Sequence, residues 1–269
     1  MKLTVLGCWA PYPRAGGACS GYLLEDGGEN ILVECGNGVL SNLQKYIDFR
    51  RLDAVIISHW HPDHYMDLYC LRHAISGARR LEPQMKPLPL FAPGVPEETF
   101  TKISHYKDSF QVTPVERLPA TQVNGISVYE TFIGRIRISF TGTDHPMPAY
   151  AMRFEANGKL FYSADTRWND NLADFASGVD LALCEASVIE EDRDYTSVGH
   201  LTARQAGSLA RAACAGQFMA THFWPEYDLE TIRAEAESGF KDKTILAREG
   251  LEVQVEPFAL LQAPSPKMI

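Results

Sequence analysis

The sequence predicts an α/β protein whose strands form two sheets. In the first third of the chain, short apolar or alternating runs are separated by glycine-rich turns, a pattern typical of strands and hairpins. Apolar residues at helical spacing follow some of these runs, and a second strand-rich region occupies the second half. With 269 residues and 45% hydrophobic content, the chain can bury a large core, in one α/β domain or in two smaller ones.

The first strands are expected at residues 3–6, 21–24 and 30–34, where glycine pairs mark the turns. A helix is expected over 39–47, because its apolar residues recur at helical spacing. Glu34 closes the third of these strands. Its expected role is to hold backbone amides of a loop.

The next strand is expected at residues 54–57, a short, apolar, β-branched run typical of a buried strand. Asp63 then lies where a helix cap is expected, ahead of an apolar helical pattern over 66–75. Residues 58–64 therefore form a strand-to-helix turn.

Proline breaks the pattern between residues 77 and 119, where six prolines occur. An edge strand at 88–92 and a helix at 96–104 are expected there. We interpret this region as a lid or rim of the functional site.

The second half predicts another sheet, with strands at residues 126–131, 135–141, 149–154, 159–163 and 179–184. A helix follows from residue 203, because Thr202 and Gln205 have the spacing of a capping box.

Composition narrows the classes of function. The net charge of −9 argues against a protein that relies on a broad basic surface to hold nucleic acid. Six cysteines without a Cys-x-x-Cys pair indicate neither a disulfide framework nor a thiolate zinc site. The chain begins with a short strand pattern, and no apolar run approaches the roughly 18 residues of a membrane span. We expect a cytoplasmic protein without membrane contact.

The turn after residues 54–57 holds three of the eight histidines, His59, His61 and His64, together with Asp63. A lone histidine is usually structural, but this density within one turn indicates a metal site. Imidazole and carboxylate ligands together suit zinc, manganese or iron, whereas calcium prefers oxygen donors.

Three later strand ends also carry metal-type residues, namely His145, Asp165 and His222. Each follows an apolar run and precedes a turn. Taken alone, each of the three has a structural explanation. Their shared position favours function, because functional groups in α/β proteins gather where strands end.

This set of residues resembles the ligand series of the metallo-β-lactamase superfamily in its two-metal form. The segments around His145, Asp165 and His200 are most similar to the branch that contains ribonuclease Z and small cyclic phosphodiesterases. The resemblance covers nearly the whole chain. It implies one metallo-hydrolase domain over residues 1–269, folded as an αβ/βα sandwich of two face-to-face sheets with outer helices.

By this resemblance, the two metal ions would be zinc, with manganese or iron as alternatives. The implied metal ligands are His59, His61, Asp63, His64, His145, Asp165 and His222, with Asp165 bridging the ions. The implied catalytic residues are His200, Glu185 and Asp63. His200 precedes a helix N-terminus, where it can protonate a leaving oxygen while Glu185 orients it.

The expected activity is hydrolysis of a small, linear or cyclic phosphodiester by a metal-bridging hydroxide. The alternative is a carboxylic ester, lactone or thioester hydrolase with the same two-metal site. The tRNA-gripping arm of ribonuclease Z has no room between His145 and Asp165, so tRNA is not the expected substrate. The cysteine-rich zinc site of phosphonate-pathway relatives is also missing. A homodimer is compatible with the sequence.

Overall fold

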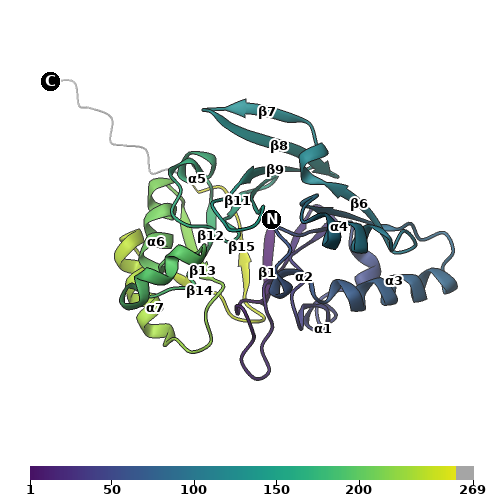
Figure 1. Cartoon of the computed structure of the whole chain (residues 1–269), viewed down its shortest axis with the longest axis horizontal. Helices are drawn as coiled ribbons and strands as arrows, with labels where there is room; N and C mark the ends of the chain where they lie inside the picture. Colours follow the sequence, from purple (N-terminus) through teal and green to yellow (C-terminus); the bar gives the residue numbers. More distant parts are fainter. Residues whose placement is uncertain (259–269) are drawn as a thin grey trace.

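Two β-sheets face each other in the computed structural model, and helices cover their outer sides (Figure 1). The structure describes residues 1–258. The two layers of strands confirm the predicted αβ/βα sandwich. The domain predicted over residues 1–269 extends past the described part, since residues 259–269 lie outside it.

The first sheet is mixed. Its strands are β1 (Lys2–Gly7), β2 (Gly21–Asp26), β3 (Glu29–Val33), β4 (Ala54–Ile56), β5 (Leu88–Ala92), β6 (Phe110–Pro114) and β15 (Glu252–Gln254). They lie in the order β15-β1-β2-β3-β4-β5-β6, antiparallel from β15 to β3 and parallel from β3 to β6. Successive side chains of a strand point to opposite faces of the sheet and so enter different cores. Leu24 and Ile56 pack between the two sheets, whereas Leu23 and Val55 pack beneath helices. Burial on both faces explains why these strands read as continuous apolar runs.

The second sheet is also mixed. Its strands are β7 (Ala120–Val123), β8 (Ile126–Ile133), β9 (Ile136–Gly142), β10 (Tyr150–Glu155), β11 (Lys159–Tyr162), β12 (Leu181–Glu185), β13 (Gln217–Thr221) and β14 (Ile245–Leu246). Their order is β14-β13-β12-β11-β10-β9-β8-β7, antiparallel from β7 to β11 and parallel from β11 to β14.

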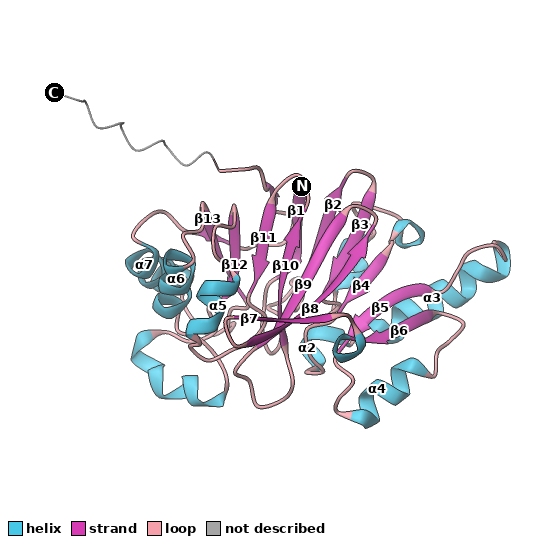
Figure 2. Cartoon of the chain, turned by 90° about the horizontal axis from the view of Figure 1, so that it is seen from above, coloured by secondary structure: helices cyan, strands magenta, loops and turns pink. Residues whose placement is uncertain are grey.

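Helices lie outside both sheets (Figure 2). They are α1 (Val39–Leu43), α2 (Pro62–Tyr65), α3 (Leu68–Leu81), α4 (Glu97–Ser104), α5 (Asp170–Phe175), α6 (Ala203–Ala212) and α7 (Leu229–Phe240), with 3-10 helices η1 (Phe49–Arg51), η2 (Val115–Arg117) and η3 (Glu190–Val198). Leu43 of α1 and Leu71 of α3 join the core beneath the first sheet, and Leu209 of α6 packs on the second. No helix within residues 1–258 is long and apolar enough to cross a bilayer.

The proline-rich region contributes two strands, β5 and β6, to the first sheet. Its interpretation as a lid or rim stays a prediction. β5 pairs with β4 on one side and β6 on the other, so it is an internal strand and not the predicted edge strand. Pro89 removes one backbone donor, but the parallel ladder continues around it. The region supports the histidine turn from behind, where Trp60 Nε1 donates to the carbonyl of Pro93 (2.8 Å).

The expected cap at Asp63 was also wrong. His61 occupies the N-cap position of α2, and Pro62 is the first helical residue, where its fixed φ and missing N–H are tolerated. Asp63 therefore lies in the first turn, and its carboxylate is directed to the cluster described below.

Candidate metal centre

The residues predicted for the site meet where strands of both sheets end. His59 to His64 follow β4, His145 follows β9, Asp165 follows β11 and His222 follows β13. Glu185 is the last residue of β12, and His200 lies just before α6. Residues more than 160 positions apart in the chain thus share one edge of the sandwich.

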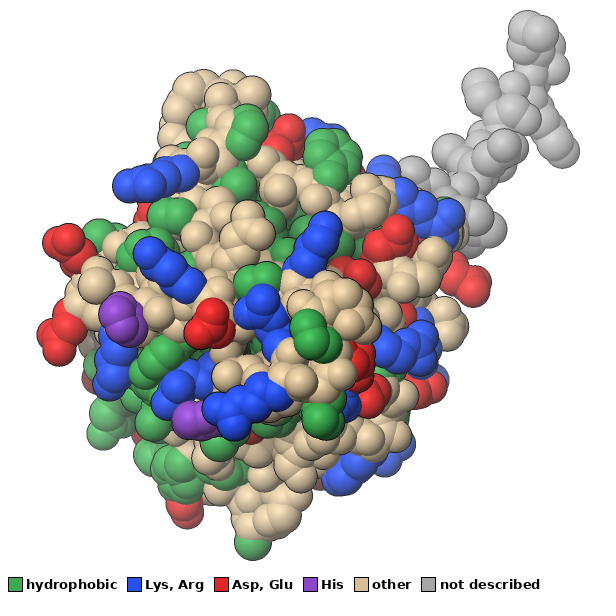
Figure 3. All heavy atoms as spheres, turned by 90° about the vertical axis from the view of Figure 1, so that its right-hand side faces the viewer, with side chains coloured by type: hydrophobic (Ala, Val, Ile, Leu, Met, Phe, Trp, Pro, Cys, Tyr) green, Lys and Arg blue, Asp and Glu red, His purple; other side chains and the backbone are tan. Residues whose placement is uncertain are grey.

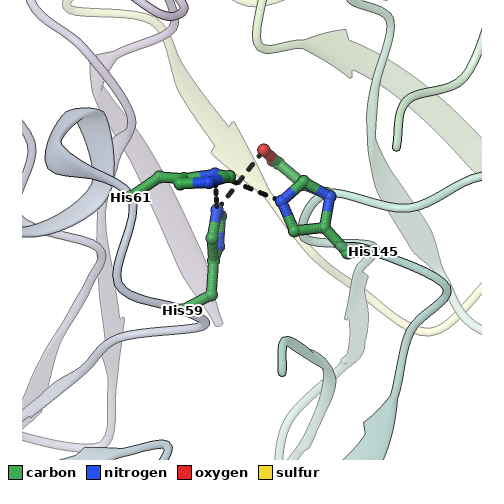
Figure 4. A group of neighbouring side chains, drawn as sticks. His59, His61 and His145 are labelled. Carbon is green, nitrogen blue, oxygen red and sulfur yellow. Dashed lines mark hydrogen bonds and ion pairs between the residues drawn. The ribbon is translucent and has the colours of Figure 1, made fainter. Parts of the chain in front are cut away.

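Three imidazole rings from two loops form the first group (Figure 4). His61 Nδ1 lies 3.0 Å from His59 Nε2 and 3.1 Å from His145 Nε2. Asp165 Oδ2 approaches His59 Nε2 at 3.5 Å. The donor atoms of these four residues all lie within 4.8 Å of one another.

A second group lies beside the first. His64 Nε2 is 3.1 Å from His222 Nε2, and Asp63 Oδ2 is 3.5 Å from the same His222 nitrogen. Asp165 directs its other oxygen, Oδ1, toward this group, at 3.2 Å from His222 Nε2. Asp165 therefore contacts both groups, one through each carboxylate oxygen.

The donor set fits divalent metal ions. Asp165 is 2% exposed, and its Oδ1 has no hydrogen-bond partner in the structure, a costly state for a buried carboxylate oxygen unless a cation faces it. Burial opposes ionisation of Asp165, but His222, His64 and His59 hold its pKa well below the usual range, so it stays charged. Burial and then His64 lower the pKa of His59, which favours the neutral imidazole that binds metals.

In three of these rings the second nitrogen is held from outside the cluster. His59 Nδ1 lies 2.9 Å from Ser58 Oγ, and His222 Nδ1 lies 2.7 Å from Ser187 Oγ. His145 Nδ1 donates to the carbonyl of Gly199 (3.0 Å). Such contacts fix the ring and the tautomer, leaving the other nitrogen free to bind a cation.

Gly199 has two reasons to be glycine. Its φ is +115°, a value that residues with side chains rarely adopt, and a Cβ there would meet His145 Nδ1 at 2.6 Å. The backbone can approach the His145 ring only because the side chain is missing.

Glu34 has the expected structural role. Its two oxygens accept the backbone N–H of Ser58, each at 3.2 Å, and its Oε1 lies 3.4 Å from His64 Nδ1. Glu34, Ala164 and His222 have φ values of 61°, 51° and 61°, so three residues at or beside the site adopt a sparsely populated conformation.

His200 and Glu185 are paired as predicted. His200 Nδ1 lies 3.2 Å from each oxygen of Glu185, and Thr166 N donates to Glu185 Oε1 (2.8 Å). Burial lowers the pKa of His200, but the charge of Glu185 and its hydrogen bond, followed by Asp165 and Asp63, raise it to about 9. Ser187 Oγ donates to Glu185 Oε2, so one carboxylate supports both His200 and, through Ser187, His222.

Two arginines near the site serve the scaffold. Arg167 pairs with Asp144 (2.7 Å) and donates to the carbonyl of Ser197, while Arg153 binds Glu155 and backbone carbonyls. Neither lines the cavity of about 550 Å³ that opens over the cluster.

The contacts made by Ser58, Ser187 and Gly199 were not found from the sequence. Serine and glycine have no metal-binding signature, and these contacts depend on the path of the backbone. The position of Ser187, two residues past the strand-ending Glu185, was the one available signal.

Fold and site together define a metallo-hydrolase of the two-sheet αβ/βα class. A family model described as the beta-lactamase superfamily domain matches residues 29–223. The "Probable metallo-hydrolase YhfI" of Bacillus subtilis is 32% identical over 252 residues, which cover 93% of this chain and 98% of that protein. The chain therefore belongs to the metallo-β-lactamase superfamily of hydrolases and lies near the ribonuclease Z branch.

One further relative agrees with this assignment, and two crystal structures share the fold. A Ribonuclease Z of Bradyrhizobium sp. is 29% identical over 288 residues, covering 89% of this chain and 95% of that protein. The crystal structure of YhfI superposes with a TM-score of 0.85, covering 94% of this chain and 98% of that one. A diphosphatase of the PhnP family, 18% identical, shares the fold with a TM-score of 0.68 over 95% of this chain and 98% of that one.

Proposed function

We propose that this protein is a phosphodiesterase that uses two divalent metal ions to hydrolyse a small phosphodiester, linear or cyclic. In this proposal His59, His61 and His145 hold one ion, Asp63, His64 and His222 hold the second, and Asp165 contacts both. Zinc is the first candidate, with manganese or iron as alternatives, because the donors are imidazole and carboxylate. Bound ions would bring the pKa of water close to neutral and neutralise charge on a phosphoryl oxygen.

The pair of His200 and Glu185 carries the proposal. Glu185 engages His200 Nδ1, so His200 Nε2 remains available to donate a proton to the departing oxygen. In phosphodiester cleavage the leaving oxygen departs in the displacement step itself, so proton donation assists that step directly, whereas in ester, lactone or thioester hydrolysis hydroxide can first add to the carbonyl. The pair therefore favours phosphodiester hydrolysis over the carboxylic ester, lactone or thioester alternative.

The comparisons support phosphate-ester chemistry, since a ribonuclease and a diphosphatase are among the proteins that this chain resembles. A tRNA substrate is disfavoured. The segment between His145 and Asp165 consists of the short β10–β11 hairpin and its flanking loops. The face formed by α3, α4 and β6 is also not uniformly basic, as a surface that grips tRNA would be, because its Lys and Arg side chains lie among apolar and acidic ones (Figure 3).

A substrate panel tests this function. Zinc-loaded and manganese-loaded protein is assayed with bis(p-nitrophenyl) phosphate and with a panel of lactones and thioesters. We expect turnover of the phosphodiester to exceed that of every ester. Faster hydrolysis of a lactone or thioester would select the alternative, and no turnover of any substrate would count against both.

A further inference from the structure

The cavity over the metal cluster has a polar floor and apolar walls. The polar floor consists of His61, Asp63, Asp165, Ser187, His200 and His222. Beyond it, the apolar wall, as we name it here, is formed by Pro11, Val188, Tyr195, Val198, Trp224 and Tyr227. These residues come from the loops after β1, β12 and β13 and from η3. Tyr195 is 59% exposed, and no residue of η3 is buried. The Tyr195 ring is therefore available to a ligand.

The charge of this cavity limits its ligand. Within residues 1–258, fourteen residues line the cavity, and none of them is lysine or arginine. A second phosphate or a carboxylate held against the apolar wall would therefore lose its hydration without gaining a cationic partner. Metal ions held by the cluster would neutralise one phosphodiester, and the remainder of the ligand should be uncharged.

The apolar wall is held in place by contacts between its loops. Arg14 donates to the carbonyls of Pro225 and Tyr227, which joins the loop after β1 to the loop after β13. Tyr227 donates its hydroxyl to Asp192 (2.6 Å), which joins that loop to η3. Trp224 and Tyr227 pack edge to face with ring centroids 4.9 Å apart. A cavity braced in this way is preformed, so little ordering cost opposes binding.

We propose that the substrate is a monoanionic phosphodiester. One of its two ester oxygens carries an uncharged aromatic group, whose ring packs against Trp224 and Tyr195. This inference rests on the proposed phosphodiesterase function and names its substrate class. Aromatic side chains on the wall favour an aromatic ligand because offset or edge-to-face ring contacts add to the gain from apolar burial.

Binding of small methylphosphonate monoesters tests the proposal through affinity, under conditions in which assay of the released alcohol shows that the ester bond stays intact. The phenyl, cyclohexyl, ethyl and 4-carboxyphenyl esters of methylphosphonic acid are titrated into zinc-loaded protein by calorimetry. The phenyl ester is expected to bind roughly tenfold more tightly than the ethyl ester and several-fold more tightly than the cyclohexyl ester. The 4-carboxyphenyl ester should bind at least several-fold more weakly than the phenyl ester. Equal affinities across the series would overturn the proposal.

Variants locate the effect on the apolar wall. In Trp224→Leu and in Tyr195→Ala the phenyl-to-ethyl affinity ratio should fall toward one, because the phenyl ester loses more affinity than the ethyl ester. Tyr195 is exposed, so its variant remains informative if Trp224→Leu folds poorly. Trp168→Ala is the matched control, because Trp168 is exposed and lies outside the cavity lining. An unchanged ratio in both wall variants would show that the ring binds elsewhere and would contradict the assignment.

The two proposals fail separately. If the protein hydrolyses bis(p-nitrophenyl) phosphate but binds the four phosphonates equally, the aromatic substrate class is wrong and the phosphodiesterase function stands. If it binds the phenyl ester selectively but hydrolyses no phosphodiester, the proposed function is wrong and the ring-binding wall stands.

Discussion

At the scale of single residues, His200 is expected to contribute to turnover and not to metal binding. Its Nδ1 is held by Glu185, and the ring lies at the edge of the donor cluster. His200→Ala should lower kcat by about 10²- to 10⁴-fold, the range typical of general acid catalysis, at unchanged metal content. Steady-state kinetics and elemental analysis measure the two effects. His105→Ala, at an exposed position outside the site, is the control, and metal loss in His200→Ala would contradict the role.

Ser187 is expected to position a metal ligand. Its hydroxyl lies between His222 Nδ1 and the carboxylate of Glu185, so it fixes the tautomer that presents His222 Nε2 to the cluster. Ser187→Ala should weaken zinc binding by about 10- to 100-fold, measured by competition with a chromogenic chelator. Ser208→Ala, whose hydroxyl bonds the carbonyl of Arg204 on α6, should leave zinc affinity unchanged. Equal zinc affinity in the two variants would show that Ser187 does not position His222.

Side chains with distinctive chemistry could be predicted from sequence, and their supports could not. The seven proposed ligands were found because imidazole and carboxylate groups at strand ends are rare enough to be noticed, and the structure brings them together. Their metal-binding roles remain predictions. Ser58, Ser187 and Gly199 contact the ligand rings through hydroxyl and carbonyl groups. Such groups are common in every protein, so only the coordinates show which hydroxyls and carbonyls face a ligand ring.

At the scale of elements, α6 places the proton donor. Thr202 caps this helix in a complete capping box with Gln205, and its hydroxyl also donates to Glu190. Thr202→Ala should lower the free energy of unfolding by about 1 kcal/mol, the usual cost of losing an N-cap, and should also lower kcat because His200 lies two residues away. Urea unfolding and kinetics measure both effects. Thr202→Ser keeps the cap, so a loss of stability as large in Ser as in Ala would argue against capping as the cause.

Elements with strong periodicity were predicted, and weak or composite ones were missed. The internal strands and α6 were confirmed to within one or two residues at most of their ends, because their burial imposes a continuous or alternating apolar pattern. All four residues of β7 are exposed, and β14 and β15 have only two and three residues, so none of them carries a readable pattern. In the proline-rich region the strand at 88–92 and the helix at 96–104 were predicted, but β6 was missed, so β5 was assigned to an edge of the sheet.

At the scale of the whole molecule, metal binding should stabilise the fold, because the proposed ligands come from loops of both sheets. Removal of the ions by chelation should cost about 3–4 kcal/mol per ion when the free metal concentration is 100–1,000 times Kd. The melting temperature should then fall by roughly 6–16 °C per ion, at about 2–4 °C for each kcal/mol. Calorimetry with and without chelator measures the shift. Asp165→Asn, which removes the residue shared by both groups, should melt at nearly the same temperature in both conditions, and a full shift in that variant would contradict the proposed site.

The homodimer and the cytoplasmic location expected from the sequence stay predictions. All six cysteines lie in the described part of the chain and are free, and four of them are buried.

The contact between Gly199 and His145 links the support of a proposed metal ligand to the position of the proposed proton donor, His200. The carbonyl that accepts from His145 Nδ1 belongs to the residue directly before His200, so a metal ligand and the proton donor share one stretch of main chain. If the segment carrying His200 swung outward, it would release the His145 ring at the same moment. The acid therefore cannot be withdrawn while the neighbouring ligand keeps its support, and both functions should be gained or lost in concert.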